Sequence, residues 1–283
     1  MKRSYSIILL VLMAVVFSSC EEKIDFDLNN SEYSRLVVEG SITDQQKAHT
    51  VKLTRTTSYY NNEQAPAERN AIVTISDDNE AFILTETSHG IYQTDSTVQG
   101  VIGNTYTLNI LTMDNKSYIA TSALSSIAPI DSITYEYIEQ FVHGGDQVKG
   151  YLLKTSGPEP LGVGNNYMWF VYIDNKLVTE KVSDIMFVTD DYVDGNYISE
   201  FGFYLIEQEL RPTDTLDVTV EAHSFPRSYY DFLMAIMLET EYRGQGGGMF
   251  DGPPANVPSN ISNGAIGYFR ASAVVSKSIK VSG

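Results

Sequence analysis

The chain contains a single cysteine among its 283 residues, Cys20, which stands between an apolar run and an acidic one. A single thiol excludes an intramolecular disulfide, and it leaves no set of thiolates for a zinc or iron–sulfur site. If Cys20 is also consumed by modification, cysteine-based catalysis is excluded as well. The fold must then be held together by the burial of apolar side chains.

Long apolar segments are also scarce. The longest uncharged apolar run covers residues 7–17 and follows Lys2 and Arg3, whereas a helix that crosses a bilayer core needs about 20 apolar residues. A basic start followed by a short apolar run is typical of a secretory signal peptide. We therefore predict that residues 1–19 are a signal peptide.

Basic residues are few. The chain has 19 Lys and Arg against 36 Asp and Glu, which gives a formal net charge of −17. Such a surface repels the phosphate backbone, and the sequence has no basic cluster to oppose that repulsion. The sequence therefore predicts no nucleic-acid partner.

Motifs for catalysis and cofactor binding are missing as well. The four histidines stand apart from one another in the sequence, and none has a second His or a Glu at the spacing of a zinc site. The chain has no Gly-x-Ser-x-Gly elbow, phosphate loop or dinucleotide fingerprint. We predict a non-catalytic protein without a cofactor.

The best metal candidate is the stretch TDDYVDGNYISE, residues 189–200, in which Asp190, Asp191 and Asp194 could direct oxygens at a hard cation such as calcium. Tyr192 fills the third position, so the EF-hand pattern is not met. Asp194 and Gly195 also fit a simple turn. The pattern alone does not predict a metal site.

The N-terminal region does contain two small residues, Ser18 and Ser19, directly before Cys20. This pattern resembles the lipobox of bacterial lipoproteins, in which the cysteine is acylated and becomes the mature N-terminus. The resemblance implies that Cys20 anchors the protein in a lipid bilayer, because two or more acyl chains, at about 0.8 kcal/mol per buried methylene, attach a protein stably. The alternative is an ordinary secretory peptide with an incidental thiol.

An acidic tether, residues 20–34, follows the signal peptide and begins with Glu21 and Glu22 after the cysteine. In some bacterial lipoproteins, acidic residues at this place direct export to the outer face of the outer membrane, and this stretch resembles them. The alternative is a merely solvated linker. We expect a lipid-anchored outer-membrane protein that faces the cell exterior.

The pattern of the remaining residues predicts a mainly β fold. Short alternating runs at spacings of about 8 to 12 residues, separated by turn residues, predict an immunoglobulin-like or prealbumin-like β-sandwich over residues 35–127. Pro129 marks a boundary, since proline interrupts strand pairing. Residues 128–283 are predicted to form a second antiparallel β-rich domain.

One helix is predicted in this second domain, over residues 226–243, because its apolar side chains recur at helical spacing on one face. The acidic opposite face favours packing on a sheet over lying in a membrane. A glycine- and proline-rich loop, residues 244–264, precedes a last strand over 265–279. A loop of this length inside a compact domain is usually either functional or disordered.

Aromatic and large apolar residues in the predicted loops are the best candidates for contact with a partner or ligand. Tyrosine offers a rigid contact area with a polar tip, which suits recognition of sugars, peptides or another protein. Packing at strand ends is the alternative for each. The candidates are Tyr59, Tyr60, Tyr192, Tyr197, Met249 and Phe250.

The C-terminal segment PANVPSNISNGAIGYFRASAV, residues 254–274, together with the signal peptide and the segments APIDSITYEY and YYDFL, resembles the bacterial lipoproteins grouped as domain of unknown function 4249. The residues that carry this C-terminal likeness are Asn260, Asn263, Gly264, Gly267, Tyr268 and Phe269. Members of that family are typically encoded beside TonB-dependent outer-membrane receptors. The resemblance thus implies a surface component of a nutrient-uptake or envelope system, and it carries over no catalytic residue.

We therefore predict an outer-membrane-anchored binding or accessory component of a TonB-dependent uptake or envelope system, with such a receptor as a partner. One alternative is a cell-surface hydrolase acting on glycan or peptide. Another is a purely structural envelope lipoprotein. The sequence does not name the ligand.

Overall fold

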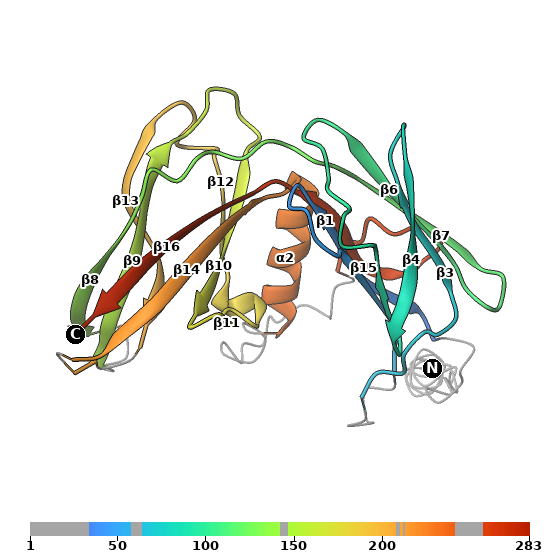
Figure 1. Ribbon diagram of the computed structural model, residues 1–283, viewed down its shortest axis with the longest axis horizontal. Helices are drawn as coiled ribbons and strands as arrows, with labels where there is room; N and C mark the ends of the chain where they lie inside the picture. The colour runs from blue at the N-terminus through green and yellow to red at the C-terminus, as the bar shows by residue number, and fades with distance from the viewer. Residues whose placement is uncertain (1–33, 58–63, 142–146, 208–209, 212, 241–256) are drawn as a thin grey trace, which may run out of the picture.

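The computed structural model describes residues 34–57, 64–141, 147–207, 210–211, 213–240 and 257–283 (Figure 1). Strands make up 53% of the structure, which confirms the mainly β prediction. The described residues contain one α-helix, α2 (Arg227–Thr240), and one short 3-10 helix, η2 (Val182–Asp184). In Figure 1, α2 lies between two lobes built of strands.

The first lobe is an eight-stranded sheet in the order β15-β1-β2-β5-β4-β3-β6-β7. Neighbouring strands are antiparallel except β1 and β15, which run parallel although they are far apart in the sequence. Its strands are β1 (Leu36–Thr43), β2 (Thr50–Arg55), β3 (Ile72–Ser76), β4 (Ala81–Ser88), β5 (Ile91–Gln93), β6 (Thr105–Leu111), β7 (Ser117–Ala123) and β15 (Ile266–Ser272).

This lobe differs from the predicted sandwich of two separate sheets. The strand β4 contains an irregularity between Glu86 and Ser88, beyond which β5 continues the hydrogen-bonded order towards β2. A bulge of this kind bends a strand and increases its twist. The eight strands therefore form one curled, nearly closed, barrel-like sheet.

Alternation of apolar and polar residues produces the core of this sheet. Successive residues of β7 are alternately exposed and buried, as expected for side chains that point to opposite faces. The inward side chains of β1 to β7 meet those of β15 in one cluster, with Leu108 and Phe269 fully buried.

The open edges of the sheet, β7 and β15, are linked by the described end of the predicted 244–264 loop. The Asn260 Nδ2 group donates to the Thr121 carbonyl oxygen at 3.2 Å and to the Phe269 carbonyl oxygen at 2.7 Å, and its Oδ1 accepts the Phe269 N–H at 3.0 Å. The Ser262 N–H donates to the Ile119 carbonyl oxygen of β7, and the Ser262 hydroxyl oxygen accepts the Ile119 N–H, both at 2.8 Å. These bonds satisfy backbone groups that would otherwise be left at two open edges.

Glycine is required where β15 approaches β1. Gly267 has φ +101°, and a Cβ built on it would lie 2.0 Å from the Val38 carbonyl oxygen. A side chain at this position would meet both an unfavourable backbone conformation and a backbone clash. The parallel pairing of β1 with β15 therefore depends on Gly267.

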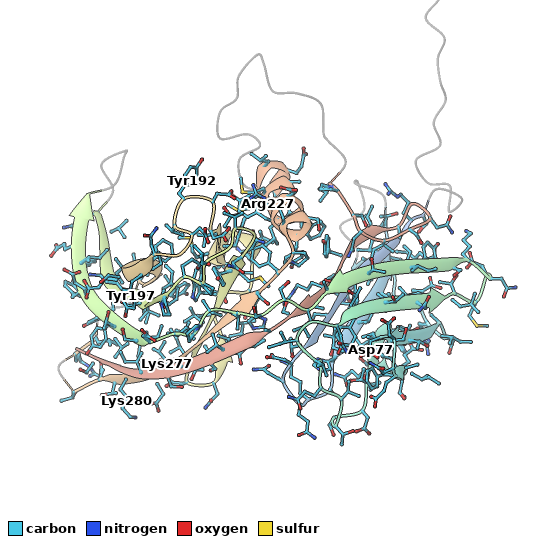
Figure 2. All side chains as sticks on the ribbon, turned by 90° about the horizontal axis from the view of Figure 1, so that it is seen from above. Asp77, Tyr192, Tyr197, Arg227, Lys277 and Lys280 are labelled. Carbon is cyan, nitrogen blue, oxygen red and sulfur yellow. The ribbon has the colours of Figure 1, made fainter. Side chains whose placement is uncertain are left out.

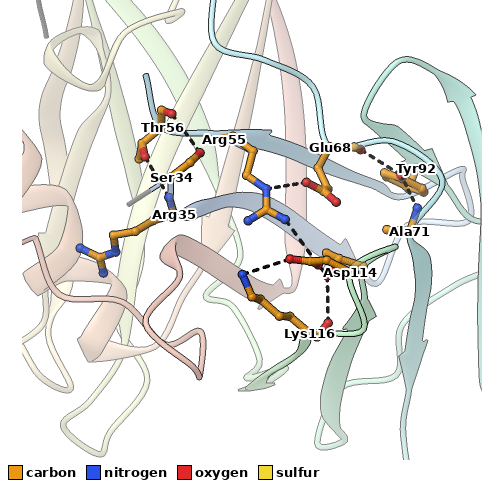
Figure 3. A network of polar contacts seen from close by, with 10 residues as sticks. Ser34, Arg35, Arg55, Thr56, Glu68, Ala71, Tyr92, Asp114 and Lys116 are labelled. Carbon is orange, nitrogen blue, oxygen red and sulfur yellow. Dashed lines mark hydrogen bonds and ion pairs between the residues drawn. The ribbon is translucent and has the colours of Figure 1, made fainter. Parts of the chain in front are cut away.

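A polar network joins strand β2, the turn between β6 and β7, and the loop that contains Glu68 (Figure 3). The Arg55 Nε donates to the Glu68 carboxylate at 2.5 Å, and an Arg55 terminal nitrogen lies 3.9 Å from Asp114. The Tyr92 hydroxyl donates to the Glu68 carbonyl oxygen at 2.9 Å. The hydrogen bond from Thr112, ahead of the Lys116 and Arg55 charges, lowers the pKa of Asp114 to about 2.

The second lobe consists of two smaller antiparallel sheets. The five-stranded sheet contains β11 (Lys176–Leu177), β10 (Asn166–Ile173), β14 (Thr215–Ser224) and β16 (Val274–Ser282), with β12 (Met186–Thr189) also paired to β10. The three-stranded sheet has the order β13 (Tyr197–Ile206), β9 (Gln147–Pro158) and β8 (Ser132–Phe141). Buried side chains from both sheets, including Leu153, Val171 and Val220, form a second core.

The last strand of the sequence prediction, residues 265–279, is divided between the lobes. Ala273 alone separates β15 from β16, and it is fully buried. The segment 128–283 thus contributes the strand β15 to the first sheet and β16 to the second lobe. One extended segment therefore joins the two lobes, as Figure 1 shows.

The helix α2 packs as predicted, on strands from both lobes. Tyr229 and Phe232 place their ring centroids 4.8 Å and 5.3 Å from that of Tyr268 on β15. Tyr230 lies 5.4 Å from Phe187 on β12. The predicted helix extends to residue 243, and its described part ends at Thr240.

Candidate functional site

A cavity of about 230 Å³ lies between the two sheets of the second lobe. Its walls come from the ends of β9 and β13 on one side and from β10, β12 and β14 on the other. The segment 128–130, which leads from the first lobe, closes one side, and Tyr192 and Val193 of the β12–β13 loop cover another. Most of the lining side chains are apolar.

Two loops at the cavity are tied together by aspartates. The buried Asp190 carboxylate accepts the backbone N–H groups of Gly164 and Asn165 at 2.9 and 3.0 Å. Asp194 accepts the Gly162 N–H at 2.6 Å. The loop 159–165 and the loop 190–195 are therefore held in a fixed relation by charge-assisted hydrogen bonds.

The third aspartate of the metal candidate points elsewhere. Asp191 accepts hydrogen bonds from Thr189 at 2.9 Å and from Arg227 of α2 at 2.8 Å. The three aspartates thus bind donors of the chain itself. Within the described ranges, no group of three or more His, Cys, Asp or Glu residues is arranged to hold a metal ion.

One carboxyl group lies inside the cavity wall. Glu159 is 7% exposed, and it accepts hydrogen bonds from the Tyr167 hydroxyl at 2.8 Å and from the Asn165 amide at 3.0 Å. Burial raises the pKa of Glu159 above its ordinary value, and the nearby charges of Asp190 and Asp194 act in the same direction. Burial also raises the pKa of Tyr167, and the hydrogen bond with Glu159 raises it further.

Aromatic rings form much of the inner wall. The Trp169 ring is 7% exposed and lies 5.7 Å from the rings of both Phe201 and Phe203. Its indole N–H is buried and has no acceptor among the described residues. A buried donor without a partner costs about 1–3 kcal/mol of stability. The packing of the Trp169 ring must therefore offset the cost of burying its N–H group.

Large apolar side chains are exposed on the two loops beside the mouth of the cavity. Tyr192 is 96% exposed on the loop 190–195, and Leu161 and Val163 are 87% and 73% exposed on the loop 159–165. A Cβ built on Gly195 would lie 2.9 Å from the Leu161 side chain, so the two loops touch at this point. In Figure 2, Tyr192 and Tyr197 lie on the same lobe but apart from each other.

Of the predicted contact residues, Tyr192 lines the cavity. Tyr197 does not line it: its neighbour Ile198 does, and successive side chains of a strand point to opposite faces. The other predicted residues, Cys20, Tyr59, Tyr60, Met249 and Phe250, lie outside the described residues.

Sequence reasoning missed the inner wall. Glu159, Tyr167 and Trp169 come from two neighbouring elements and show no motif. A signal was available in part: Trp169 is the only tryptophan of the chain, and Tyr167 and Trp169 are two positions apart on one strand, so they share a face. Sequence does not show that this face borders a cavity.

A family model described as "Domain of unknown function (DUF4249)" matches residues 21–278. The chain belongs to the DUF4249 family. The match confirms the resemblance inferred from the C-terminal segment and covers both lobes. Among curated proteins, none matches this DUF4249 chain.

The C-terminal residues that carry the DUF4249 likeness do not line the cavity, whereas Ala128, Pro129 and Ile130 of the family-like segment APIDSITYEY do. Asn260 links β7 to β15, Gly267 permits the approach of β15 to β1, and Phe269 fills the core of the first sheet. Among the described helices, none has the length and apolar character that a membrane crossing requires.

Proposed function

We propose that this DUF4249 chain is a lipid-anchored, non-catalytic binding protein on the outer face of the outer membrane, and that it serves a TonB-dependent uptake or envelope system. The observation that carries the binding role is the apolar cavity of about 230 Å³ lined by Trp169 and covered by Tyr192. Cavities of this kind, apolar with a few placed polar groups, are typical of binding sites.

The anchor in this proposal is Cys20, and the partner is a TonB-dependent receptor. Support comes from the short apolar run before Cys20 and from the family membership of the chain. Cys20→Ser should release the protein from membranes, because no acyl chain can then be attached to sulfur. Unchanged membrane retention of this variant would contradict the anchor.

The cavity can be tested with its own tryptophan. Trp169 is the only tryptophan in the chain and lines the cavity, so its fluorescence should change when toluene, a small apolar probe, enters. Val193→Phe should reduce this response by filling the cavity. Val101→Phe is the matched control, because Val101 is 56% exposed on the first lobe and lies outside the lining.

The same pair of variants tests the receptor. We expect the detergent-solubilised, acylated protein and its Val101→Phe variant to co-purify with a TonB-dependent receptor, identified by mass spectrometry, and Val193→Phe to recover less of it. Equal recovery by all three proteins would remove the cavity from the receptor contact. Recovery of no receptor by the wild-type protein would contradict the transport role.

A second candidate, a cell-surface hydrolase, is favoured by one observation. The pKa of Glu159 is raised, and a carboxylic acid with a raised pKa can act as a general acid. Hydrolysis of a glycan that is abolished in Glu159→Gln, with folding intact, would favour this function over binding alone.

A further inference from the structure

The cavity and the apolar side chains around its mouth point to a particular kind of ligand. We propose that the cavity is an anchor pocket that receives one large apolar side chain of a protein partner, with a Lys or Arg next to that side chain in the partner's sequence. This inference rests on the proposed function, because it names what the same cavity binds.

The size of the cavity limits its content to about one ring or one large side chain. A cavity of about 150 Å³ admits benzene, and pockets for drug-sized ligands measure about 300–1,000 Å³. The cavity here measures about 230 Å³, between the two. A Phe, Leu or Met side chain fits that range, whereas an oligosaccharide or a large cofactor does not.

The surroundings of the mouth favour a macromolecule over a free small molecule. A ligand small enough to fill the cavity would leave Leu161 and Val163 in water, since neither lines it. Single exposed apolar residues are common, but a group around one opening is typical of an interaction surface. In protein interfaces, a buried anchor surrounded by such contacts supplies most of the binding free energy.

The wall chemistry favours a protein over a sugar. A sugar needs hydrogen-bonding partners for its hydroxyl groups, because unsatisfied polar groups lose free energy on burial. The lining consists mainly of apolar side chains such as Val188, Ile198 and Phe201. The carboxylate of Glu159 already accepts two hydrogen bonds from the chain itself.

The charge near the mouth favours a basic neighbour in the partner. Glu159, Asp190 and Asp194 lie close enough for the last two to affect the pKa of the first. The whole chain carries a formal net charge of −17. A Lys or Arg beside the anchoring side chain would gain attraction from this charge, and the acidic surface would speed the encounter.

The loops that carry the mouth are already fixed by internal bonds. Asp190 and Asp194 hold the backbone of Gly162, Gly164 and Asn165 in place. Binding therefore requires little ordering of these loops, and rigid preformed sites lose less entropy when a partner binds.

Peptides of defined sequence can test the proposal on the full chain. The probes are acetyl-Gly-Phe-Arg-Gly-amide, the same peptide with Ala in place of Phe, the same peptide with Glu in place of Arg, and toluene. Binding is followed by the fluorescence of Trp169. We expect the Phe-Arg peptide to bind at least about tenfold more tightly than the Ala peptide, and more tightly than the Phe-Glu peptide and toluene.

Variants at the rim separate this proposal from binding in the cavity alone. Leu161→Ser should weaken the Phe-Arg peptide several-fold and leave toluene unaffected, because Leu161 is exposed and outside the lining. Ile83→Ser on β4 is the matched control, since Ile83 is 75% exposed on the other lobe. Val193→Phe should reduce binding of both probes, and circular dichroism checks that each variant is folded.

Two results would overturn the proposal in distinguishable ways. Toluene binding without tighter binding of the Phe-Arg peptide, and without an effect of Leu161→Ser, would make the cavity a site for free small molecules. That result leaves the proposed binding function standing. If neither toluene nor any peptide changes Trp169 fluorescence, both the anchor pocket and the cavity-based function are wrong.

Discussion

Two buried histidines, His49 and His223, should make the folded state lose stability as the pH falls from 7 to 5. They are 2% and 5% exposed. Burial lowers the pKa of each from 6.5 to about 4. The unfolded chain therefore takes up protons in this pH range that the folded chain does not.

The hydrogen bond at Nδ1 of His49 favours the neutral form of its ring, whereas the bond to Val98 raises the pKa and is outweighed by burial. Its Nδ1 accepts the Thr43 backbone N–H at 3.3 Å, so its Nε2 carries the proton and donates to the Val98 carbonyl oxygen at 3.2 Å. Protonation of Nδ1 would direct an N–H at another N–H. The geometry and the lowered pKa thus agree.

The surroundings of His223 also lower its pKa, although an acidic neighbour acts in the opposite direction. Its Nδ1 lies 3.4 Å from an Arg270 guanidinium nitrogen, which can only donate. Its Nε2 lies 3.3 Å from the Glu221 carboxylate, which favours the charged ring. Burial is the largest influence, and with the charges of Arg270 and Lys47 it outweighs the effect of Glu221 on the pKa.

The magnitude follows from the pKa of His223 in the two states. A change from 6.5 to about 4 corresponds, at about 1.36 kcal/mol per unit, to about 3 kcal/mol over the full range. About 2 kcal/mol of this is lost by pH 5. Because the folded pKa is the lower one, the loss begins as the pH falls through 6.5 and stops growing near pH 4. His49 contributes with the same sign.

Urea unfolding, followed by far-ultraviolet circular dichroism at pH 7, 6 and 5, measures this dependence. The free energy of unfolding of wild-type protein should fall by about 2 kcal/mol more than that of His223→Gln between pH 7 and pH 5. His89→Gln, at an exposed residue, controls for the loss of a histidine. The reasoning is refuted if wild type and His223→Gln lose the same free energy over this range.

Further predictions concern packing and closure, each measured by urea unfolding. Trp169→Ala should cost about 3–5 kcal/mol, whereas Trp169→Phe should cost clearly less, because it keeps a ring and removes a buried N–H without an acceptor; equal losses would contradict this account. Gly267→Ala should cost more than about 2 kcal/mol, because of the clash with Val38, and Gly264→Ala only about 1 kcal/mol, because its Cβ would have no neighbour within 4 Å. Asn260→Ala should cost about 1–3 kcal/mol by leaving backbone groups unpaired, and a neutral result would show that the first sheet does not need this link.

Local patterns predicted local structure well. Asp174 and Asn175, two residues typical of turns, form the hairpin between β10 and β11, and both have positive φ, 50° and 64°, as a tight two-residue turn between twisted strands requires. The helix over 226–243 is found at Arg227–Thr240. These features depend on neighbours in sequence, so the sequence is sufficient to predict them.

Long-range pairing was not predictable in the same way. The parallel partner of β1 is β15, whose residues lie more than 200 positions later. Nothing in the alternation of β15 distinguishes a strand of the first sheet from one of the second lobe. The cavity has the same origin, since Glu159, Trp169 and Tyr192 meet only when two sheets pack face to face. Tyr192 was predicted because a tyrosine in a loop offers a rigid contact area with a polar tip, whereas nothing in the sequence distinguishes Glu159 from the other acidic residues.

Membership of the DUF4249 family and the proposed binding role therefore rest largely on different parts of the structure. The residues that carry the family likeness, such as Asn260 and Gly267, keep the first sheet closed and attached to β16. The cavity is lined mainly by other segments, from β9 to β14, and by the start of the family-like segment APIDSITYEY. The side chains at its mouth lie on loops, which tolerate change better than the elements they connect. A chain with the same closing strand and a different residue at Leu161 or Tyr192 would keep this fold and bind a different partner. Family membership thus accounts for the scaffold, and the partner must be inferred from the loops at the cavity.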